Sequence, residues 1–174
     1  PSIDLRYEIG DDSTQPLMAR LEARTEFPTI TVADIDNDMI NYFNTSMGRI
    51  TTPPMSMTVS VLGMGRLILM ISKDLVFVQG DGLFDRMISL RGMVGDINAA
   101  LKSLRYTCRA QDGCTEDMLD SVHLLVDDDG FSGKGGPLTA EATVQFIIAA
   151  AEDTTAEENY LKSLNRSEVN YTYP

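Results

Sequence analysis

Residues Gly95–Ile148 read GDINAALKSLRYTCRAQDGCTEDMLDSVHLLVDDDGFSGKGGPLTAEATVQFII, and this stretch decides the fold. It opens with the pattern of a short helix over Asp96–Leu104, in which the Asp96 carboxylate can accept hydrogen bonds from free backbone N–H groups of the first turn. Two later segments alternate between apolar and polar residues, as strands with one face on a core do. Their apolar positions are Val122, Leu124 and Val126, then Val144, Phe146 and Ile148. The stretch predicts the closing half of a β-sandwich.

Short apolar segments separated by Gly and Asp turns precede this stretch. Ile30 and Val32 fall on one face of a strand, and residues 66–71 are apolar on both faces, which predicts a central strand covered on both sides. Gly63 and Gly65 bracket a turn typical of a hairpin. Close spacing of short strands predicts an all-β Greek-key sandwich with one short helix.

The limits of regular alternation predict the domain organisation. Alternation is regular over residues 25–150, which we expect to form the sandwich. We expect residues 1–24 to be a linker or an edge strand from a preceding unit. Residues 151–174 have the pattern of a linker with a short helix that leads to a following unit. Because the chain begins at Pro1 without methionine, we expect it to be a piece of a longer polypeptide.

The charge of the chain restricts its partners. A formal net charge of −12 over 174 residues disfavours nucleic acid and anionic membranes, because both need Lys and Arg to neutralise phosphates. No apolar run approaches the length of a membrane span, so we expect no membrane insertion of this segment. The excess of carboxylates serves solubility or, where carboxylates cluster, holds divalent cations.

The two cysteines, Cys108 and Cys114, are separated by RAQDG. This spacing matches neither a CxxC redox pair nor a four-ligand zinc site. A disulfide that closes the loop fits better, with Asp112 and Gly113 making the turn, and it would stabilise the fold by about 2 kcal/mol. The alternative is a pair of reduced thiols in a cytosolic protein.

Three N-x-[ST] sequons occur, at Asn44, Asn165 and Asn170. Together with a disulfide they favour the secretory route, and so an extracellular or cell-surface location. We expect these asparagines to be glycosylation sites.

Several motifs, taken in order, resemble cadherin-like, immunoglobulin-like tandem repeats of large secreted adhesins and surface fibre proteins. They are TEFPTITVADID, GRLILMISKDLVFVQGDG, GDINAALKSLRYT and DSVHLLVDDDGFSGKGGPLTAEATVQFII. The INAAL and DDDGFSGKGG elements are the most specific. The chain departs from the family at Thr107-Cys108, where Thr-Pro is usual, and in lacking the Asn-Asp-Ala-Pro joint to a next repeat.

The resemblance implies calcium as the cofactor, because comparable acids bind calcium between successive cadherin domains. The residues that match the motifs are Glu26, Asp34, Asp36, Asp127 and Asp129. Calcium prefers six to eight oxygen ligands, which several converging carboxylates can supply. The alternative is that these acids only make Asx turns and keep the loops soluble.

Catalytic motifs are not evident in the sequence. His123 is the one histidine and has no GxSxG-type partner, so we expect it to be a partly exposed strand residue. The GFSGKGG segment lacks the GK[ST] ending of a phosphate loop. We therefore expect the protein not to be an enzyme, with an extracellular hydrolase domain as the weakest alternative.

The resemblance implies a structural and adhesive function, as one repeat of an extracellular fibre, adhesin stalk or surface hair. The partners would be neighbouring repeats and other fibre or surface proteins. The two ends should then lie at opposite poles of the sandwich. The residues before Thr25 and after Ile148 should contact neighbouring copies rather than fold back over the core. The alternative is a lectin-like module that binds glycans.

Overall fold

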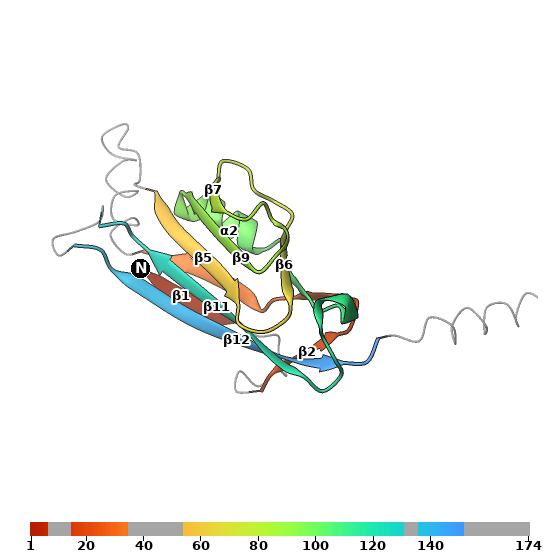
Figure 1. Cartoon of the computed structure of the whole chain (residues 1–174). Helices are drawn as coiled ribbons and strands as arrows, with labels where there is room; N and C mark the ends of the chain where they lie inside the picture. Colours follow the sequence, from red (N-terminus) through yellow and green to blue (C-terminus); the bar gives the residue numbers. More distant parts are fainter. Residues whose placement is uncertain (7–14, 35–53, 131–135, 152–174) are drawn as a thin grey trace, which may run out of the picture.

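The computed structural model describes residues 1–6, 15–34, 54–130 and 136–151, which form an all-β sandwich with one short α-helix (Figure 1). The larger sheet has six strands, in the order β2 (Leu17–Arg20), β12 (Thr139–Ala149), β11 (Leu119–Asp127), β5 (Met55–Val61), β9 (Met87–Gly92) and β7 (Val76–Gln79). Facing it are a four-stranded sheet and a two-stranded sheet. These contain β3 (Arg24–Glu26), β10 (Leu104–Thr107), β6 (Arg66–Leu69) and β8 (Leu83–Asp85), then β1 (Ser2–Arg6) and β4 (Thr29–Ala33).

Strand β11 lies at the centre of the large sheet. It pairs with β12 from Leu119↔Ile147 to Asp127↔Thr139, and with β5 on its other side. The predicted alternation of β11 and β12 is confirmed, because their alternate apolar residues are buried. The buried positions that the sequence predicted are Val122, Leu124, Val126, Val144, Phe146 and Ile148.

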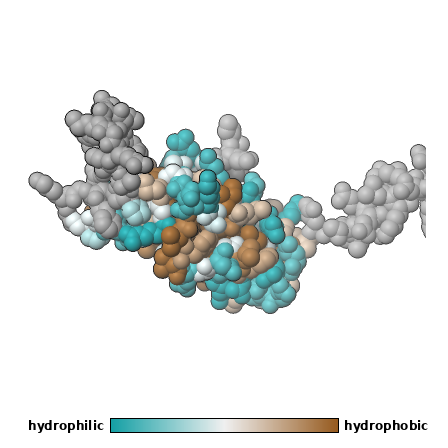
Figure 2. Space-filling view, turned by 90° about the horizontal axis from the view of Figure 1, so that it is seen from above, coloured by the Kyte–Doolittle hydropathy of each residue, from teal (hydrophilic) through white to brown (hydrophobic). Residues whose placement is uncertain are grey.

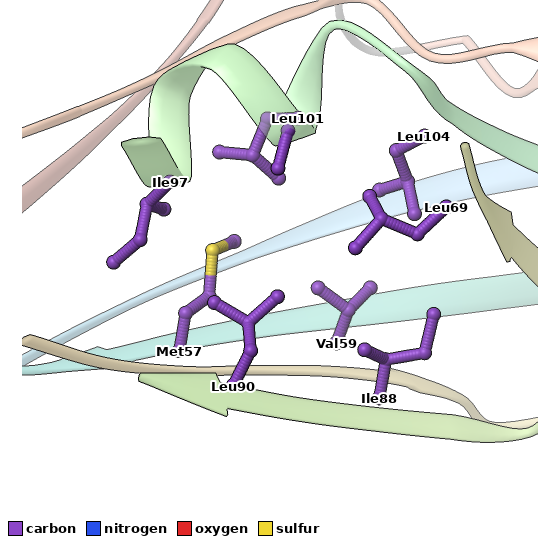
Figure 3. A pocket seen from close by; sticks show the side chains of 9 residues that line it. Met57, Val59, Leu69, Ile88, Leu90, Ile97, Leu101 and Leu104 are labelled. Atoms are coloured by element: carbon purple, nitrogen blue, oxygen red, sulfur yellow. The ribbon is translucent and has the colours of Figure 1, made fainter. Parts of the chain in front are cut away.

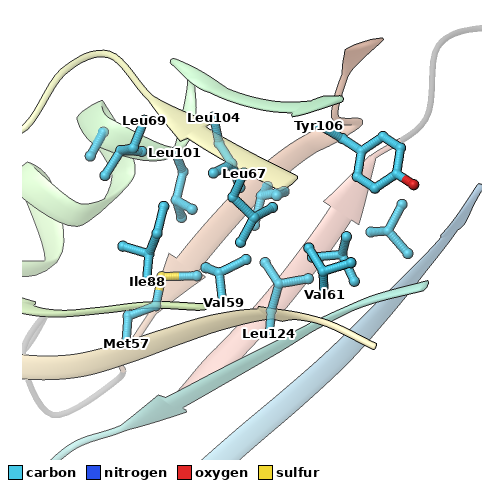
Figure 4. Packing of buried hydrophobic residues seen from close by; sticks show 14 of the residues in the cluster. Met57, Val59, Val61, Leu67, Leu69, Ile88, Leu101, Leu104, Tyr106 and Leu124 are labelled. Atoms are coloured by element: carbon cyan, nitrogen blue, oxygen red, sulfur yellow. The ribbon is translucent and has the colours of Figure 1, made fainter. Parts of the chain in front are cut away.

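The core lies between the two layers (Figure 4). Side chains of β5, such as Val59 and Val61, point toward Leu67 of β6 and Leu104 of β10. Strand β6 ends at Leu69, two residues before the predicted end at Ile71. Over the strand itself, cover on both faces is confirmed, because Leu67 and Leu69 are buried on one face and Ile68 on the other, whereas Met70 and Ile71 are exposed. Burial of about 0.8 kcal/mol per CH₂ group makes this interior the main source of stability.

The helix α2 (Val94–Leu101) begins and ends earlier than the sequence predicted. Its N-cap is Met93, which makes no side-chain cap hydrogen bond, and Asp96 lies within the first turn, so the predicted cap was wrong. Instead, the Asn98 amide holds the helix on β4. It accepts from the Val32 N–H and donates to the Val32 carbonyl, both at 2.8 Å. Helix position is thus set by a tertiary contact rather than by capping.

Two connections differ from the sequence prediction. The turn at Gly63 and Gly65 is not a hairpin, because β5 belongs to the large sheet and β6 to the four-stranded sheet. The sandwich also begins before Thr25, since β1 pairs with β4 and β2 pairs in parallel with β12. The described residues before Thr25 therefore add strands to both layers and pack on the core, contrary to the expectation that they would not fold back over it.

The described ends of the chain lie at opposite poles of the sandwich. Figure 1 shows the N-terminus at the left and the end of β12 at the right. The left pole, which we name the acidic pole, carries Asp34 and Asp127–Asp129. The right pole, which we name the disulfide pole, carries the Cys108–Cys114 loop and the Gly63–Gly65 turn.

Candidate functional site

The predicted disulfide between Cys108 and Cys114 is confirmed. The Cα atoms of the two residues lie 5.7 Å apart, and both side chains are buried. A 3₁₀ turn, η1 (Ala110–Asp112), forms the loop, and Gly113 closes it with φ of +94°. That conformation lies in the left-handed region, which glycine adopts without steric cost, so the Asp112–Gly113 turn also forms as predicted.

Two arginines hold Asp112 inside this loop. The Asp112 carboxylate accepts from Arg109 Nε at 2.7 Å and from Arg66 Nη2 at 3.0 Å. Burial acts to raise the pKa of Asp112, but the hydrogen bonds and charges of Arg109 and Arg66 outweigh it and hold this pKa below its ordinary value. The Arg109 guanidinium also lies 4.3 Å from the ring centroid of Phe84, which is cation–π geometry. The loop is therefore fixed to β6 and β8 as well as by its disulfide.

Hydrogen bonds also connect the disulfide loop to the C-terminal end of β12. Glu22 donates its N–H to the Cys108 carbonyl at 2.9 Å and accepts from the Ala110 N–H through its side chain at 2.7 Å. The neighbouring Leu21 N–H donates to the carbonyl of Ala149, the last residue of β12, at 2.9 Å. A continuous set of bonds therefore joins the end of β12 to the disulfide.

A buried carboxylate, Asp120, organises the rest of the disulfide pole. Its two oxygens accept from the backbone N–H groups of Gly63 and Gly65, both at 2.8 Å, from the Ser121 N–H at 2.6 Å, and from the Tyr106 hydroxyl at 2.7 Å. Asp120 is 3% exposed, so these donors replace water around a charge that would otherwise be costly to bury. Asp120 thus fixes the turn that carries the chain from one layer to the other.

Tyr106 connects this carboxylate to the core. Its ring stacks on Phe146 with centroids 4.2 Å apart and planes 5° apart. Burial first, and then the hydrogen bond and the charge of Asp120, raise the pKa of Tyr106 far above its ordinary value, so the phenol stays protonated and donates. A Cβ atom on Gly65 would lie 2.2 Å from this ring, which explains the glycine at that position.

Sequence reasoning missed Asp120, although its pattern contained a signal. Asp120 is in phase with the buried residues Val122 and Leu124 of β11, so alternation assigns it to the core face. A carboxylate at such a position must be satisfied by hydrogen bonds. The two glycines of the β5–β6 turn supply donors, but their proximity to Asp120 depends on the tertiary fold.

The acidic pole uses its carboxylates to shape a turn. Asp127 accepts from the Asp129 N–H at 2.8 Å, and Asp128 accepts from the N–H groups of Gly130 and Leu138, both at 2.9 Å. Asp129, at φ of +53°, accepts from the Ser56 hydroxyl and forms an ion pair with Arg91 at 3.0 Å. The Asx-turn alternative thus describes the local contacts of Asp127 and Asp128.

The structure brings together only some of the acids that the resemblance implied for calcium. Asp34 follows β4 and lies toward the same pole as Asp127 and Asp129, because β4 ends where β1 begins. Glu26 lies on β3 beyond the other end of β4, where it pairs with Arg105 at 2.7 Å. Among the described residues there is no group of three or more His, Cys, Asp or Glu side chains that could hold a metal ion. Asp36 lies outside them, and calcium binding stays a prediction.

Of the remaining predicted site residues, the structure describes His123 but not the three sequons. His123 is partly exposed on β11, as predicted, and its Nε2 lies 3.2 Å from the Glu141 carboxylate. The three sequons, at Asn44, Asn165 and Asn170, lie outside the described residues. Their glycosylation therefore stays a prediction.

A groove of about 220 Å³ opens between the β3–β4 connection and the turn from α2 to β10. Glu26, Phe27, Pro28, Thr29 and Ile30 line one wall, and Leu101, Lys102, Leu104 and Arg105 line the other. The lining combines apolar and charged side chains. The sequence contained no sign of the groove, because its walls come from segments some 75 residues apart.

A second space, about 10 Å³, lies inside the core beneath α2 (Figure 3). Its lining is entirely apolar and includes Met57, Leu90 and Ile97. A volume of about one water without polar partners stays dry. This space is a packing imperfection rather than a ligand site.

Exposed apolar side chains occur on the strands at the sheet edges. Figure 2, seen from above, shows hydrophobic residues in the middle of the face with hydrophilic residues around them. Exposed apolar residues on β7, on β8 and directly after β6 are Val76, Val78, Leu83, Met70 and Ile71.

In the part of the chain that the structure describes, no helix is long and apolar enough to cross a membrane. Neither a scan of the chain against protein-family models nor a search of curated proteins found a match.

Proposed function

We propose that this chain is a non-catalytic structural module, one link in a tandem array that forms an extracellular fibre, adhesin stalk or surface hair. The observation that carries the proposal is the placement of the described ends at opposite poles of the sandwich (Figure 1). Modules whose ends lie at opposite poles extend an array by their full length. Neighbouring repeats and other surface proteins would be its partners.

The hydrogen bonds of β12, the last described strand, resist a pull along the axis of that strand. Strand β12 pairs with β11 from Leu119↔Ile147 to Asp127↔Thr139, and in parallel with β2 from Phe146↔Leu17 to Ala149↔Arg20. Antiparallel hydrogen bonds lie perpendicular to the strands, and those of the parallel pair are slanted. A pull on Ala151 along β12 therefore loads many of these hydrogen bonds at the same time, instead of breaking them one after another.

Contacts at the disulfide pole also hold the C-terminal end of β12 in place. Leu21 and Glu22 connect the end of β12 to the disulfide loop, which Asp112 in turn fixes to β6. A disulfide of this kind persists in oxidising compartments, which supports an extracellular or cell-surface location. Calcium at the acidic pole would stiffen a junction by neutralising Asp34, Asp127 and Asp129.

Single-molecule force measurement tests the proposal. The protein is tethered either through residues 1 and 151 or, as the control geometry, through residue 1 and Asp81 in the β7–β8 turn. Because β7 and β8 are edge strands with short ladders, the control pull opens few bonds at a time and should need a lower force. Equal unfolding forces in the two geometries would overturn the proposal.

The parent polypeptide provides a second test. Further copies of the INAAL unit on either side of this module are expected. A lone copy beside a catalytic domain would contradict the tandem-array role.

A further inference from the structure

We infer that the groove between the β3–β4 connection and the α2–β10 turn binds one acidic sugar residue, a pyranose that carries a carboxylate. This binding site goes beyond the structural function, because it does not depend on how modules are joined. The groove of about 220 Å³ brings cations, a hydroxyl and apolar walls to one place. Each of these features recognises a different part of such a sugar.

The charge at the groove is opposite to that of the protein. The chain has 14 Lys and Arg against 26 Asp and Glu, yet the groove lining contains Lys102 and Arg105 against Glu26 alone. Lys102 is exposed and has no ion pair with any described residue. A local positive potential on an acidic protein selects anionic ligands.

Arg105 is held in position before any ligand binds. Its Nη1 donates to the carbonyls of Lys102 at 3.0 Å and Leu104 at 2.9 Å, and its Nη2 donates to Glu26 at 2.7 Å. A guanidinium has five N–H donors, so these bonds leave two for a carboxylate. A fixed guanidinium loses little side-chain entropy on binding, which favours even a small ligand.

The size and walls of the groove favour a sugar over an acidic peptide. The groove volume of about 220 Å³ lies below the roughly 300–1,000 Å³ of sites for drug-sized ligands, which favours a ligand of one ring. Phe27 is half-buried with its ring edge-on to Phe146, and its remaining surface can meet the C–H face of a pyranose, whereas Pro28 is buried behind it. The exposed Thr29 hydroxyl can bond the polar edge of the sugar. A peptide carboxylate would use the cations but would not fill the space between these walls.

NMR titration of the isotope-labelled protein tests the inference with three probes. Methyl β-D-glucuronide should give saturable shifts at Phe27, Thr29, Lys102 and Arg105, with a Kd on the order of 1 mM. Methyl β-D-glucoside, which has the same ring without the carboxylate, should bind at least tenfold more weakly. Equal shifts with the glucoside would overturn the requirement for a charge. Equal shifts with N-acetylaspartate would replace the sugar by an acidic peptide.

Matched variants locate the site. Lys102→Gln should weaken glucuronide binding about tenfold, whereas Lys73→Gln, at a lysine that is 87% exposed and outside the groove, should leave it unchanged. Raising the salt concentration should weaken binding to the unmodified protein, because the contact is between exposed charges. Absence of saturable shifts, or an equal effect of both variants, would overturn the inference. Neither result would change the unfolding forces that test the structural function.

Discussion

The two poles of this sandwich use carboxylates in different ways. At the disulfide pole, Asp120 is buried and satisfied by three backbone N–H groups and a tyrosine, and Asp112 lies between two arginines. At the acidic pole, Asp127 and Asp128 bond the backbone of their own turn or its immediate flank. The carboxylates of the disulfide pole join segments far apart in the sequence, whereas Asp127 and Asp128 bond a local turn and Asp129 beside them bonds the distant Ser56 and Arg91.

This difference indicates which pole contributes more to the free energy of unfolding. Removing a carboxylate that bridges layers leaves several buried donors without partners, and each costs about 1–3 kcal/mol. At the acidic pole, Asp127 is only partly buried, so water can replace its carboxylate, although the neighbouring Asp128 is 2% exposed. Asp120 should therefore be more sensitive to substitution than Asp127.

The largest expected effect is that of Asp120→Ala. It leaves the Tyr106 hydroxyl and the N–H groups of Gly63 and Gly65 without their acceptor, so the free energy of unfolding should fall by about 4 kcal/mol. Urea unfolding followed by circular dichroism measures it. The matched change at the acidic pole, Asp127→Ala, removes one bond in a half-exposed turn and should cost about 1 kcal/mol. Equal losses would contradict the distinction between the poles.

Loss of the disulfide should be the next largest effect. Closing the short Cys108–Cys114 loop restricts the unfolded chain, so reduction or Cys108→Ala with Cys114→Ala should lower the free energy of unfolding by about 2 kcal/mol. Urea unfolding with and without a reductant measures the difference. The double variant is the control for reduction, since a reductant should not destabilise it further. An unchanged midpoint on reduction would show that the ion pairs of Asp112 suffice to hold the loop.

Strands β11 and β12 were predictable because each has one face in the core. Alternation in β11 and β12 identified every buried apolar residue of these strands, and an apolar run identified β6 as a covered strand, although the run extended two residues beyond its end. The disulfide followed from the spacing of two cysteines around an Asp-Gly turn. These features depend on local pattern, which the sequence contains in full.

Features that depend on distant segments were not predictable in the same way. The Gly63–Gly65 turn has the residues of a hairpin, but the strands on either side of it belong to different sheets, and the distant Asp120 accepts hydrogen bonds from the turn. The start of α2 is set by the contact between Asn98 and β4 rather than by Asp96. β1 and β2 are short and weakly patterned, so only their pairing with β4 and β12 assigns them to the sandwich.

The acidic pole should respond to calcium if the resemblance to cadherin-like repeats extends to its ions. A ligand that binds only the folded state stabilises it by about 1.4 kcal/mol at a tenfold excess over Kd. A thermal melt in calcium should therefore show a higher midpoint than one in chelator. Asp127→Asn should abolish the difference, while Asp112→Asn at the other pole should preserve it. Equal midpoints in calcium and chelator would contradict calcium binding but would not contradict the structural function.

The smallest expected effect is the acid sensitivity that Asp112 contributes to the disulfide pole. Arg109 and Arg66 lower the pKa of this carboxyl in the folded state, so the folded protein takes up its proton less readily than the unfolded chain. The resulting stability is fully present above the unfolded-state pKa of about 3.9 and is lost as the pH falls through the lower folded-state pKa.

Asp112→Asn should therefore lower the free energy of unfolding at pH 7 by about 1 kcal/mol, because both guanidiniums stay partly solvated. The difference from the unmodified protein should persist down to about pH 4 and shrink below it, which urea unfolding across this range measures. Asp4→Asn is the matched control, since Asp4 pairs with Arg6 on the surface and should change stability by only a few tenths of a kcal/mol. A difference between Asp112→Asn and the unmodified protein that stayed constant down to the lowest pH would mean that the Asp112 side chain acts by shape. The loop would then be held by its disulfide and by Glu22, without a contribution from charge.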